Sequence, residues 1–393
     1  MKPRTRAHTR TRATAGGALI AALLLGASLT GTTGTATAAG EAGTAGTAGS
    51  TLRVAAGDSA VARTGTVTGT VTGTGTVTEY YDLGDTAFTD SVSGTVSEIR
   101  AVVHRPRRLS GKLPLVVISH GSWYACTDPD AQSWPCDRGE PYPSHLGYDY
   151  LGRALAARGY VVVSLSADGI NMVSFDYGDR ARIINEHLRL WRELDSGGGP
   201  LADSLPSLRG HVDLERVGTI GHSRGGKGVM WQASDKHRDE IPDGVRVGAV
   251  LALAPVKFDP PGDGNADALV TRTPVAVVTS GCDGAVHEQG QEYLDDVVGL
   301  TTEPAYSVSL RDGNHNYFNT RWTPPAPLGE DDSTCPDREL APAPQQNALT
   351  VYATAFFDKH LGNDPSGEPV LTGERPLPDV VSTTRVVQPA RAD

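Results

Sequence analysis

The chain has 393 residues, of which 38% are hydrophobic and 21% charged, so it can form one large folded domain or two smaller ones. Its formal net charge is −11, which argues against a non-specific nucleic-acid binder or a protein that binds anionic membrane surfaces. The 46 glycines and 26 prolines indicate many loops, but the apolar content is still sufficient for a core.

Residues 1–38 have the features of a signal peptide for export. Five basic residues and no acidic residue accompany an apolar stretch at 18–29, which is too short to span a membrane comfortably. Ala36-Thr37-Ala38 fits a cleavage site, and removal of this segment changes the net charge from −11 to −16. We therefore expect a secreted, extracellular protein without a membrane span; a single membrane anchor is the alternative.

Three further parts follow the signal peptide. Residues 39–78 are rich in Gly, Thr, Ala and Ser, and are expected to form a flexible linker or, alternatively, a weak strand pair at a sheet edge. Residues 79–362 carry regular apolar patterns and are expected to form the main domain. Residues 363–393 are Pro-rich and polar, and are expected to form a loosely packed tail.

Short apolar runs alternate with amphipathic stretches between residues 79 and 362. The runs predict one half-buried antiparallel strand at 97–103 and buried strands at 113–119, 160–165, 217–220, 247–253, 274–279 and 306–310. Helices are predicted at 145–158, 179–194, 225–234, 288–298 and 345–361. This alternation predicts an α/β fold with a mostly parallel central sheet and helices on both faces. Only 18 residues separate Pro255 from Pro274, so no large cap domain is expected there.

A glycine-rich turn at residues 221–225 has the pattern G-x-S-x-G. The pattern alone is weak, because 46 glycines make a chance match common. Its context strengthens it, since residues 216–220 predict a strand and the residues from Gly226 onward predict a helix. That strand–turn–helix order is what a nucleophile elbow requires. We therefore predict Ser223 as a nucleophile; a buried turn serine is the alternative.

A serine hydroxyl needs a base to take its proton and a carboxylate to orient that base. Folds with this elbow place them in the chain order serine, acid, histidine, at the carboxyl ends of strands. Asp283 and His315 each follow a predicted strand in that order, so we predict them as acid and base. The alternatives are His287 for the base and, for the acid, Asp259, Asp263 and Asp312.

Backbone N–H groups are needed to hold the oxyanion that forms when a serine attacks a carbonyl. One donor is expected from Arg224, and the second from Ser122 in the loop after an early strand, with Trp123 as the alternative. His120 in the same loop is expected to shape the turn rather than to act as a base. Trp123 and Tyr124 are expected to contact substrate at the mouth of the site, with simple packing as the alternative. The Arg224 side chain is expected to pair with a nearby acid.

Four cysteines in an exported chain predict two disulfides. Of the three possible pairings we favour Cys126–Cys136, which closes a short loop, and Cys282–Cys335, which would tie the acid loop to the histidine loop. A zinc site is the alternative, but C-x-x-C spacing is missing. No metal and no cofactor are expected.

Residues 80–361 resemble the α/β-hydrolase superfamily. The run GHSRGGK at 221–227 resembles the lipase-type motif of chlorophyllases. The His120-Gly121 loop and the stretch LGRALAARGYVVV at 151–163 are similar to that group and to dienelactone-hydrolase-like and acetylhydrolase-like esterases. The resemblance implies ester hydrolysis through an acyl-enzyme and without a cofactor. The insertion between Cys126 and Cys136 and the export signal depart from the plant enzymes, which argues against chlorophyll as the substrate.

These observations predict a secreted, monomeric serine esterase that acts on a small-molecule or polymeric ester. Its activity is expected to fall as the pH drops through the pKa of the histidine, near roughly 6.5. A serine peptidase or amidase on the same fold is one alternative. A non-catalytic secreted binding protein that keeps the fold is the other.

Overall fold

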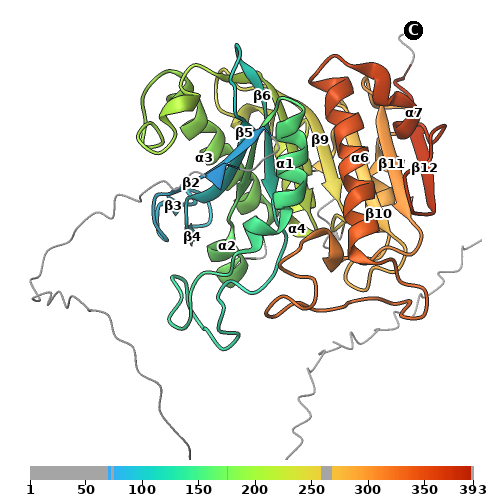
Figure 1. Ribbon diagram of the computed structural model, residues 1–393, viewed down its shortest axis with the longest axis horizontal. Coiled ribbons are helices and arrows are strands. Elements are labelled where there is room, and N and C mark those ends of the chain that lie inside the picture. The colour runs from blue at the N-terminus through green and yellow to red at the C-terminus, as the bar shows by residue number, and fades with distance from the viewer. Residues whose placement is uncertain (1–69, 72–74, 175, 258–267, 391–393) are drawn as a thin grey trace, which may run out of the picture. The chain divides into compact units, whose positions relative to one another are not determined.

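The computed structural model describes residues 70–71, 75–174, 176–257 and 268–390, which form a central sheet with helices on both sides (Figure 1). The expected signal peptide at 1–38 and residues 39–69 of the expected linker lie outside the described residues. None of the described helices is long and apolar enough to cross a membrane.

The middle layer is a ten-stranded sheet with a parallel centre. In chain order its strands are β1 (Thr70–Val71), β2 (Thr76–Asp82), β5 (Arg100–Pro106), β6 (Leu113–Ser119), β7 (Val161–Leu165), β8 (Val212–His222), β9 (Val247–Leu253), β10 (Val275–Ser280), β11 (Ala305–Leu310) and β12 (Ser382–Val387). In space the order is β1-β2-β5-β7-β6-β8-β9-β10-β11-β12. The strands from β7 to β11 in this order are parallel, and the outer pairings are antiparallel. The predicted mostly parallel sheet is confirmed. β3 (Phe88–Thr89) and β4 (Val96–Ser97) form a separate small sheet.

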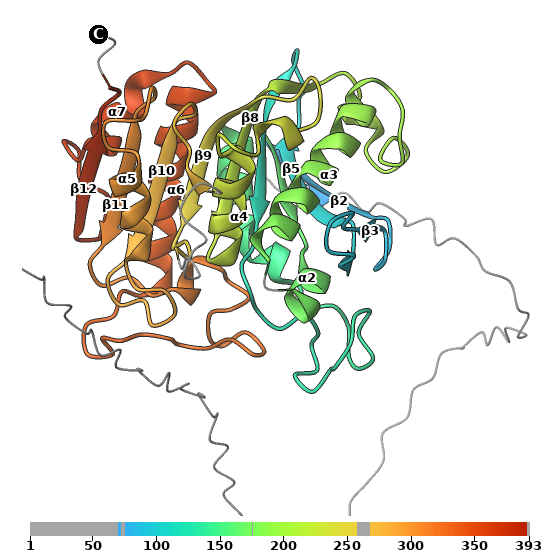
Figure 2. The same cartoon turned by 180° about the vertical axis from the view of Figure 1, so that it is seen from behind.

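Helices cover both faces of the sheet, as predicted. They are α1 (Asp149–Ala157), α2 (Asp168–Val173), α3 (Tyr177–Asp195), α4 (Arg224–Ala233), α5 (Glu292–Asp296), α6 (Pro342–His360) and α7 (Glu368–Leu371). α1 and α6 contact each other on one face, in front of the sheet in Figure 1. α3 and α4 contact each other on the opposite face, which Figure 2 shows. Each layer of helices closes its own apolar core against the sheet.

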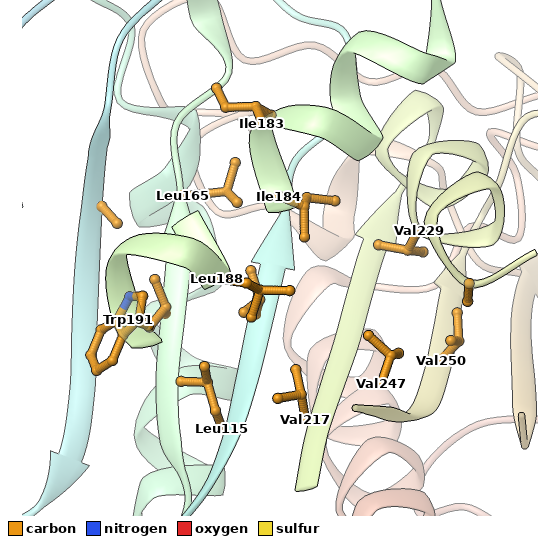
Figure 3. Close-up of a cluster of buried hydrophobic side chains, with 14 of the residues drawn as sticks. Leu115, Leu165, Ile183, Ile184, Leu188, Trp191, Val217, Val229, Val247 and Val250 are labelled. Atoms are coloured by element: carbon orange, nitrogen blue, oxygen red, sulfur yellow. The ribbon is translucent and has the colours of Figure 1, made fainter. Parts of the chain in front are cut away.

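The packing of α3 shows how sequence periodicity attaches a helix to the sheet (Figure 3). Ile184, Leu188 and Trp191 lie three or four residues apart and are fully buried in one cluster with Leu115 of β6 and Val217 of β8. Burying a side chain of this size contributes about 1.5–3 kcal/mol. This apolar face therefore fixes α3 against the centre of the sheet.

The register of the parallel strands brings their carboxyl ends to one edge. Ser119 pairs with Gly221 and Ser280 pairs with Leu310, so the loops after β6 and β8 begin side by side, as do those after β10 and β11. The long loops after β6 and β11 gather at this edge, the lower one in Figure 1. Open α/β sheets form their binding sites at the carboxyl ends of their strands.

One predicted strand is displaced. The strand expected at 97–103 is found at Arg100–Pro106, and Val96–Ser97 forms the separate strand β4, with Glu98 and Ile99 between the two strands. The buried Glu98 carboxylate accepts the backbone N–H groups of Asp168 (2.7 Å) and Gly169 (3.0 Å) at the start of α2. These two hydrogen bonds attach the segment between β4 and β5 to the start of α2.

The ends of the main domain also differ from the expected bounds. Val71 pairs with Val77, so the segment expected as a linker ends in an edge strand pair, which was its alternative interpretation. The expected tail after residue 362 contains α7 and β12, and β12 pairs antiparallel with β11 over six residues. The segment at 254–274, where no large cap is expected, includes residues 258–267, which lie outside the described residues.

Both favoured disulfides are present. The Cα atoms of Cys126 and Cys136 are 5.9 Å apart, and those of Cys282 and Cys335 are 5.3 Å apart. Among the described residues there is no free cysteine. The first bridge closes a loop after β6, and the second joins the loop after β10 to the loop after β11.

Candidate active site

Ser223 occupies a sharp turn between β8 and α4. Its φ is 57° and its ψ is −120°, a conformation that costs a residue with a side chain about 1–3 kcal/mol. Its N–H donates to the Leu253 carbonyl (2.9 Å), and its own carbonyl accepts from Gly226 (2.9 Å) and Val256 (3.1 Å). These hydrogen bonds hold the strained turn, and the serine residue is 6% exposed.

Two close backbone approaches flank the serine and require glycine. A Cβ atom on Gly221 would lie 2.0 Å from the carbonyl oxygen of Gly225. A Cβ atom on Gly121 would lie 2.5 Å from Ser223 Cβ and 3.2 Å from Ser223 Oγ. The loop after β6 therefore packs directly against the serine.

Asp283 and His315 form a buried hydrogen-bonded pair. The Nδ1–H of His315 donates to Asp283 Oδ2 at 2.7 Å, and the two residues are 3% and 0% exposed, respectively. The other carboxylate oxygen, Oδ1, accepts the backbone N–H groups of Ala285 (2.8 Å), Val286 (2.7 Å) and His287 (3.1 Å). These bonds fix the carboxylate, which in turn fixes the tautomer of His315 with Nε2 able to accept a proton.

The histidine ring lies next to the serine turn. His222, the residue before Ser223, has its ring centroid 4.8 Å from that of His315 at an interplanar angle of 39°. The structure thus brings the three residues predicted from the sequence to one edge of the sheet, from the ends of β8, β10 and β11.

The pKa of His315 is raised above its ordinary value of 6.5. Burial of the ring opposes protonation, but the charge and the hydrogen bond of Asp283 outweigh it, and the charge of Asp332 adds to them. By contrast, the pKa of His222 is lowered well below 6.5 by burial and by the neighbouring His315. The two adjacent rings therefore differ in their affinity for a proton, and His315 is the one that takes up a proton more readily.

The alternative acids and bases are engaged elsewhere or lie outside the described residues. Asp312 pairs with the Arg311 guanidinium at 2.6 Å. His287 donates its backbone N–H to Asp283 and is not its ring partner. Asp259 and Asp263 lie outside the described residues.

His120 shapes the loop after β6, as predicted. Its Nδ1–H donates to the Gly121 carbonyl at 2.8 Å, and its Nε2 accepts the Ala167 N–H at 2.8 Å. Burial, with the charge of Arg180 in second place, lowers the pKa of His120 to about 3. The ring is therefore neutral and fully occupied by backbone partners.

The peptide between Gly121 and Ser122 is held in one orientation. The Gly121 carbonyl accepts from His120 and also from Asn171 Nδ2 at 3.2 Å. In a trans peptide the N–H points opposite to the carbonyl, so the Ser122 N–H is directed away from these two donors. Within the described residues it has no hydrogen-bond acceptor. It is thus available to an oxyanion. Helix α4, whose first residue is Arg224, begins directly after Ser223, so its positive dipole end faces the same turn.

Asn171 and Arg180 are residues that the sequence analysis did not find. Asn171 Oδ1 accepts from the Arg180 guanidinium, whose Nη1 also donates to the His120 carbonyl at 3.2 Å. Arg180 is 1% exposed, and burial followed by the charge of Arg224 lowers its pKa to about 10. An asparagine in a short helix and an arginine at the start of a long one carry no signal that links them to the loop after β6.

Trp123 and Tyr124 pack against the histidine loop. The Trp123 indole stacks on Trp322 at 5.0 Å and 15°, and Trp322 stacks in turn on His222 at 4.9 Å and 29°. Tyr124 meets the edge of Trp123, and its hydroxyl donates to Glu330 at 3.3 Å. The rings have a packing role in the structure, and both Trp123 and Tyr124 are only half-buried. Trp322 had no signal in the sequence.

The Arg224 side chain faces an aromatic ring. Its guanidinium lies 5.8 Å from the centroid of Tyr177, and the Lys227 ammonium lies 4.5 Å from the same centroid. Cation–π contacts of this kind hold two basic side chains beside the first turn of α4.

Asp283, His315 and Asp332 are the one group among the described residues whose donor atoms are close enough together for a metal ion. Asp283, however, uses Oδ1 for three backbone N–H groups and Oδ2 for His315 Nδ1, so its oxygens are already bound. The arrangement fits an acid–base group, not a metal site. Three surface cavities of about 400, 570 and 530 Å³ are lined by other residues.

A comparison with protein-family models and a comparison with curated proteins found no match for this chain. The α/β fold with its mostly parallel sheet is compatible with the α/β-hydrolases.

Proposed function

We propose that this protein is a secreted serine hydrolase that cleaves carboxylic esters through an acyl-enzyme. The observation that carries the proposal is the buried hydrogen bond between His315 and Asp283 beside Ser223, which stands in a strained strand-to-helix turn. A strained backbone retained by hydrogen bonds is typical of functional sites. The alternative of a buried turn serine gives no reason for this histidine–aspartate pair beside it.

The proposed mechanism gives each of these groups one role. Ser223 Oγ attacks the ester carbonyl while His315 Nε2 takes its proton, and Asp283 stabilises the imidazolium that forms. The Ser122 N–H and the Arg224 N–H hold the oxyanion. His315 then passes the proton to the leaving alcohol, and the acyl group stays on Ser223. A water molecule gives a proton to His315 and attacks the acyl carbon, which releases the acid and returns the proton to the serine.

The substrate is proposed to be a small-molecule or polymeric ester, and the enzyme is proposed to act as a secreted monomer without a cofactor. Two disulfides and the export signal support an oxidising compartment. The resemblance of the turn at 221–227 to esterase motifs favours esters over amides, and a peptidase on the same fold is the second candidate.

The test is hydrolysis by the mature protein of p-nitrophenyl esters with short, medium and long acyl chains, beside a panel of anilides. Ser223→Ala is expected to remove nearly all turnover and labelling by a fluorophosphonate probe. The matched control is Ser234→Ala at the end of α4, because the Ser234 hydroxyl is buried and has no hydrogen-bond partner among the residues that the structure describes. Full turnover in Ser223→Ala would refute the proposal, and cleavage of anilides alone would move it to a peptidase.

A further inference from the structure

Residues 330–335, called here the acid strap, lie across the loops that carry Asp283 and His315. The Cys282–Cys335 disulfide joins the strap to the residue before Asp283, and the Thr334 N–H donates to the Cys282 carbonyl at 2.9 Å. At its other end, the Glu330 carbonyl accepts from Asn316 Nδ2 at 3.0 Å. The strap is thus attached to the residues adjoining both members of the buried pair.

Asp332 stands in the middle of the acid strap and is directed at the pair. Its Oδ2 accepts the Gly284 N–H at 3.3 Å, and its Oδ1 accepts the Asn316 N–H at 3.4 Å. One donor or acceptor atom from each of Asp332, Asp283 and His315 lies within 4.8 Å of the others. Asp332 is half-buried, and His315 therefore faces two carboxylates from two different loops.

The other charged groups near His315 point elsewhere. Asp331 and Glu339 both accept from Asn314 Nδ2, at 2.9 Å and 2.6 Å. The Glu330 carboxylate accepts from Tyr124. The ring next to His315 on the side of β8 is His222, whose pKa is lowered by burial so that it stays neutral. Within the described part of the chain, Asp283 and Asp332 are therefore the two charges that raise the pKa of His315.

We propose that Asp332 is a positioning residue of the hydrolase, a second carboxylate that stabilises protonated His315 alongside Asp283 and is held in place by the Cys282–Cys335 bridge. This inference rests on the proposed function for its kinetic consequence only; its electrostatic part is a property of the folded protein.

A second carboxylate acts mainly when His315 becomes charged. Burial raises the pKa of Asp332, protonated His315 lowers it, and the charge of Asp283 raises it. Two carboxylates beside a neutral ring repel each other, whereas the imidazolium formed during turnover attracts both. An interaction that is stronger when charge develops lowers the barrier of the chemical step and not merely the energy of the bound substrate.

The first experiment measures the titration of His315 by NMR in a protein that carries Ser223→Ala, so that no activity is needed. Asp332→Asn in this background is expected to lower the titration midpoint of His315, because a negative charge that favours the protonated ring is lost. Asp337→Asn is the control, since it removes the same charge from an exposed position of the following turn. An unchanged midpoint in Asp332→Asn would overturn the proposal whether or not the protein hydrolyses esters.

The second experiment tests the disulfide and the kinetic role. Replacing Cys282 and Cys335 by serine is expected to lower the titration midpoint of His315, as Asp332→Asn does. Replacing Cys126 and Cys136 by serine is expected to leave this midpoint unchanged. An unchanged midpoint in the first pair would refute the role of the bridge.

With active enzyme, Asp332→Asn is expected to reduce kcat on the order of fivefold with KM unchanged, a small effect because the contact is partly exposed and screened. It is also expected to move the acid limb of the pH profile to lower pH. A loss confined to KM, or an unmoved acid limb, would count against a role in stabilising His315. Absence of ester hydrolysis in the parent enzyme would reject the proposed function and leave the NMR result standing.

Discussion

Substituting Gly121 by alanine tests the contact between the oxyanion loop and the serine turn. The new methyl group would lie 2.5 Å from Ser223 Cβ and 2.7 Å from the His222 carbonyl oxygen, whereas ordinary contacts of a Cβ atom begin at 3.4 Å. Both contacts are therefore shorter than an ordinary contact by more than half an ångström. Four backbone hydrogen bonds hold Ser223, so the loop has to yield, and the Ser122 N–H moves with it.

The expected magnitude follows from these two effects. Misplacing one oxyanion donor costs about 10²–10³ in kcat. Forcing a methyl group into a packed contact lowers the free energy of unfolding by about 1–3 kcal/mol, which leaves a domain of this size folded. We therefore expect Gly121→Ala to be folded, with kcat reduced at least about 100-fold on a short p-nitrophenyl ester.

The assay compares kcat, KM and urea unfolding of Gly121→Ala with those of Gly198→Ala. The control has the same chemical change in a loop where the nearest atom to the new methyl group is the Glu193 carbonyl oxygen at 4.0 Å. Gly198→Ala is expected to match the parent protein in rate. A Gly121→Ala enzyme with the kcat of its parent would refute the inferred position of the oxyanion loop.

Two further outcomes are expected at the same site. The pH profile of kcat/KM should have an acid limb with its midpoint above 6.5, because only neutral His315 accepts the serine proton and the pKa of His315 is raised. The pKa values of His120 and His222 are lowered, so these two rings stay neutral over this limb. A midpoint below 6.5 would contradict the assignment of the base. Asn171→Ala removes one of two donors to the oxyanion-loop carbonyl and should reduce kcat about tenfold without changing KM. Asn185→Ala on α3 is its control, and equal rates in the two variants would argue against a role for Asn171.

Patterns that depend on neighbours in the sequence were enough to predict the parallel sheet and the serine turn. Each buried run of β6 to β11 is short and apolar, and the G-x-S-x-G turn lies between a strand and a helix as the elbow requires. The pairing of Cys282 with Cys335 was expected because it would tie the acid loop to the histidine loop, and the bridge is present. The hydrogen bond between Asp283 and His315 agrees with the order in which they occur along the chain.

Residues that belong to none of these sequence motifs were not predictable. Asn171, Arg180 and Asp332 act through hydrogen bonds to backbone groups or through charges on other loops, and no local pattern marks them. The helix expected at 288–298 is shorter in the structure, where a 3₁₀ turn at Gln289–Gln291 precedes α5. Gly290 lies in this 3₁₀ turn, and glycine weakens helical structure. The apolar residues of that stretch predicted a helix across the glycine, whereas the structure has a regular α-helix only after it.

Strand β12 has a practical consequence for preparing the protein. The composition after residue 362 invites truncation of the chain there for expression, yet β12 pairs with β11 over six residues. A shortened chain would present β11 as a bare edge, with unpaired backbone groups next to the buried side chains of Tyr306 and Val308. Such an edge is a template for pairing with other chains. A C-terminal deletion at this point is therefore expected to make the protein aggregate.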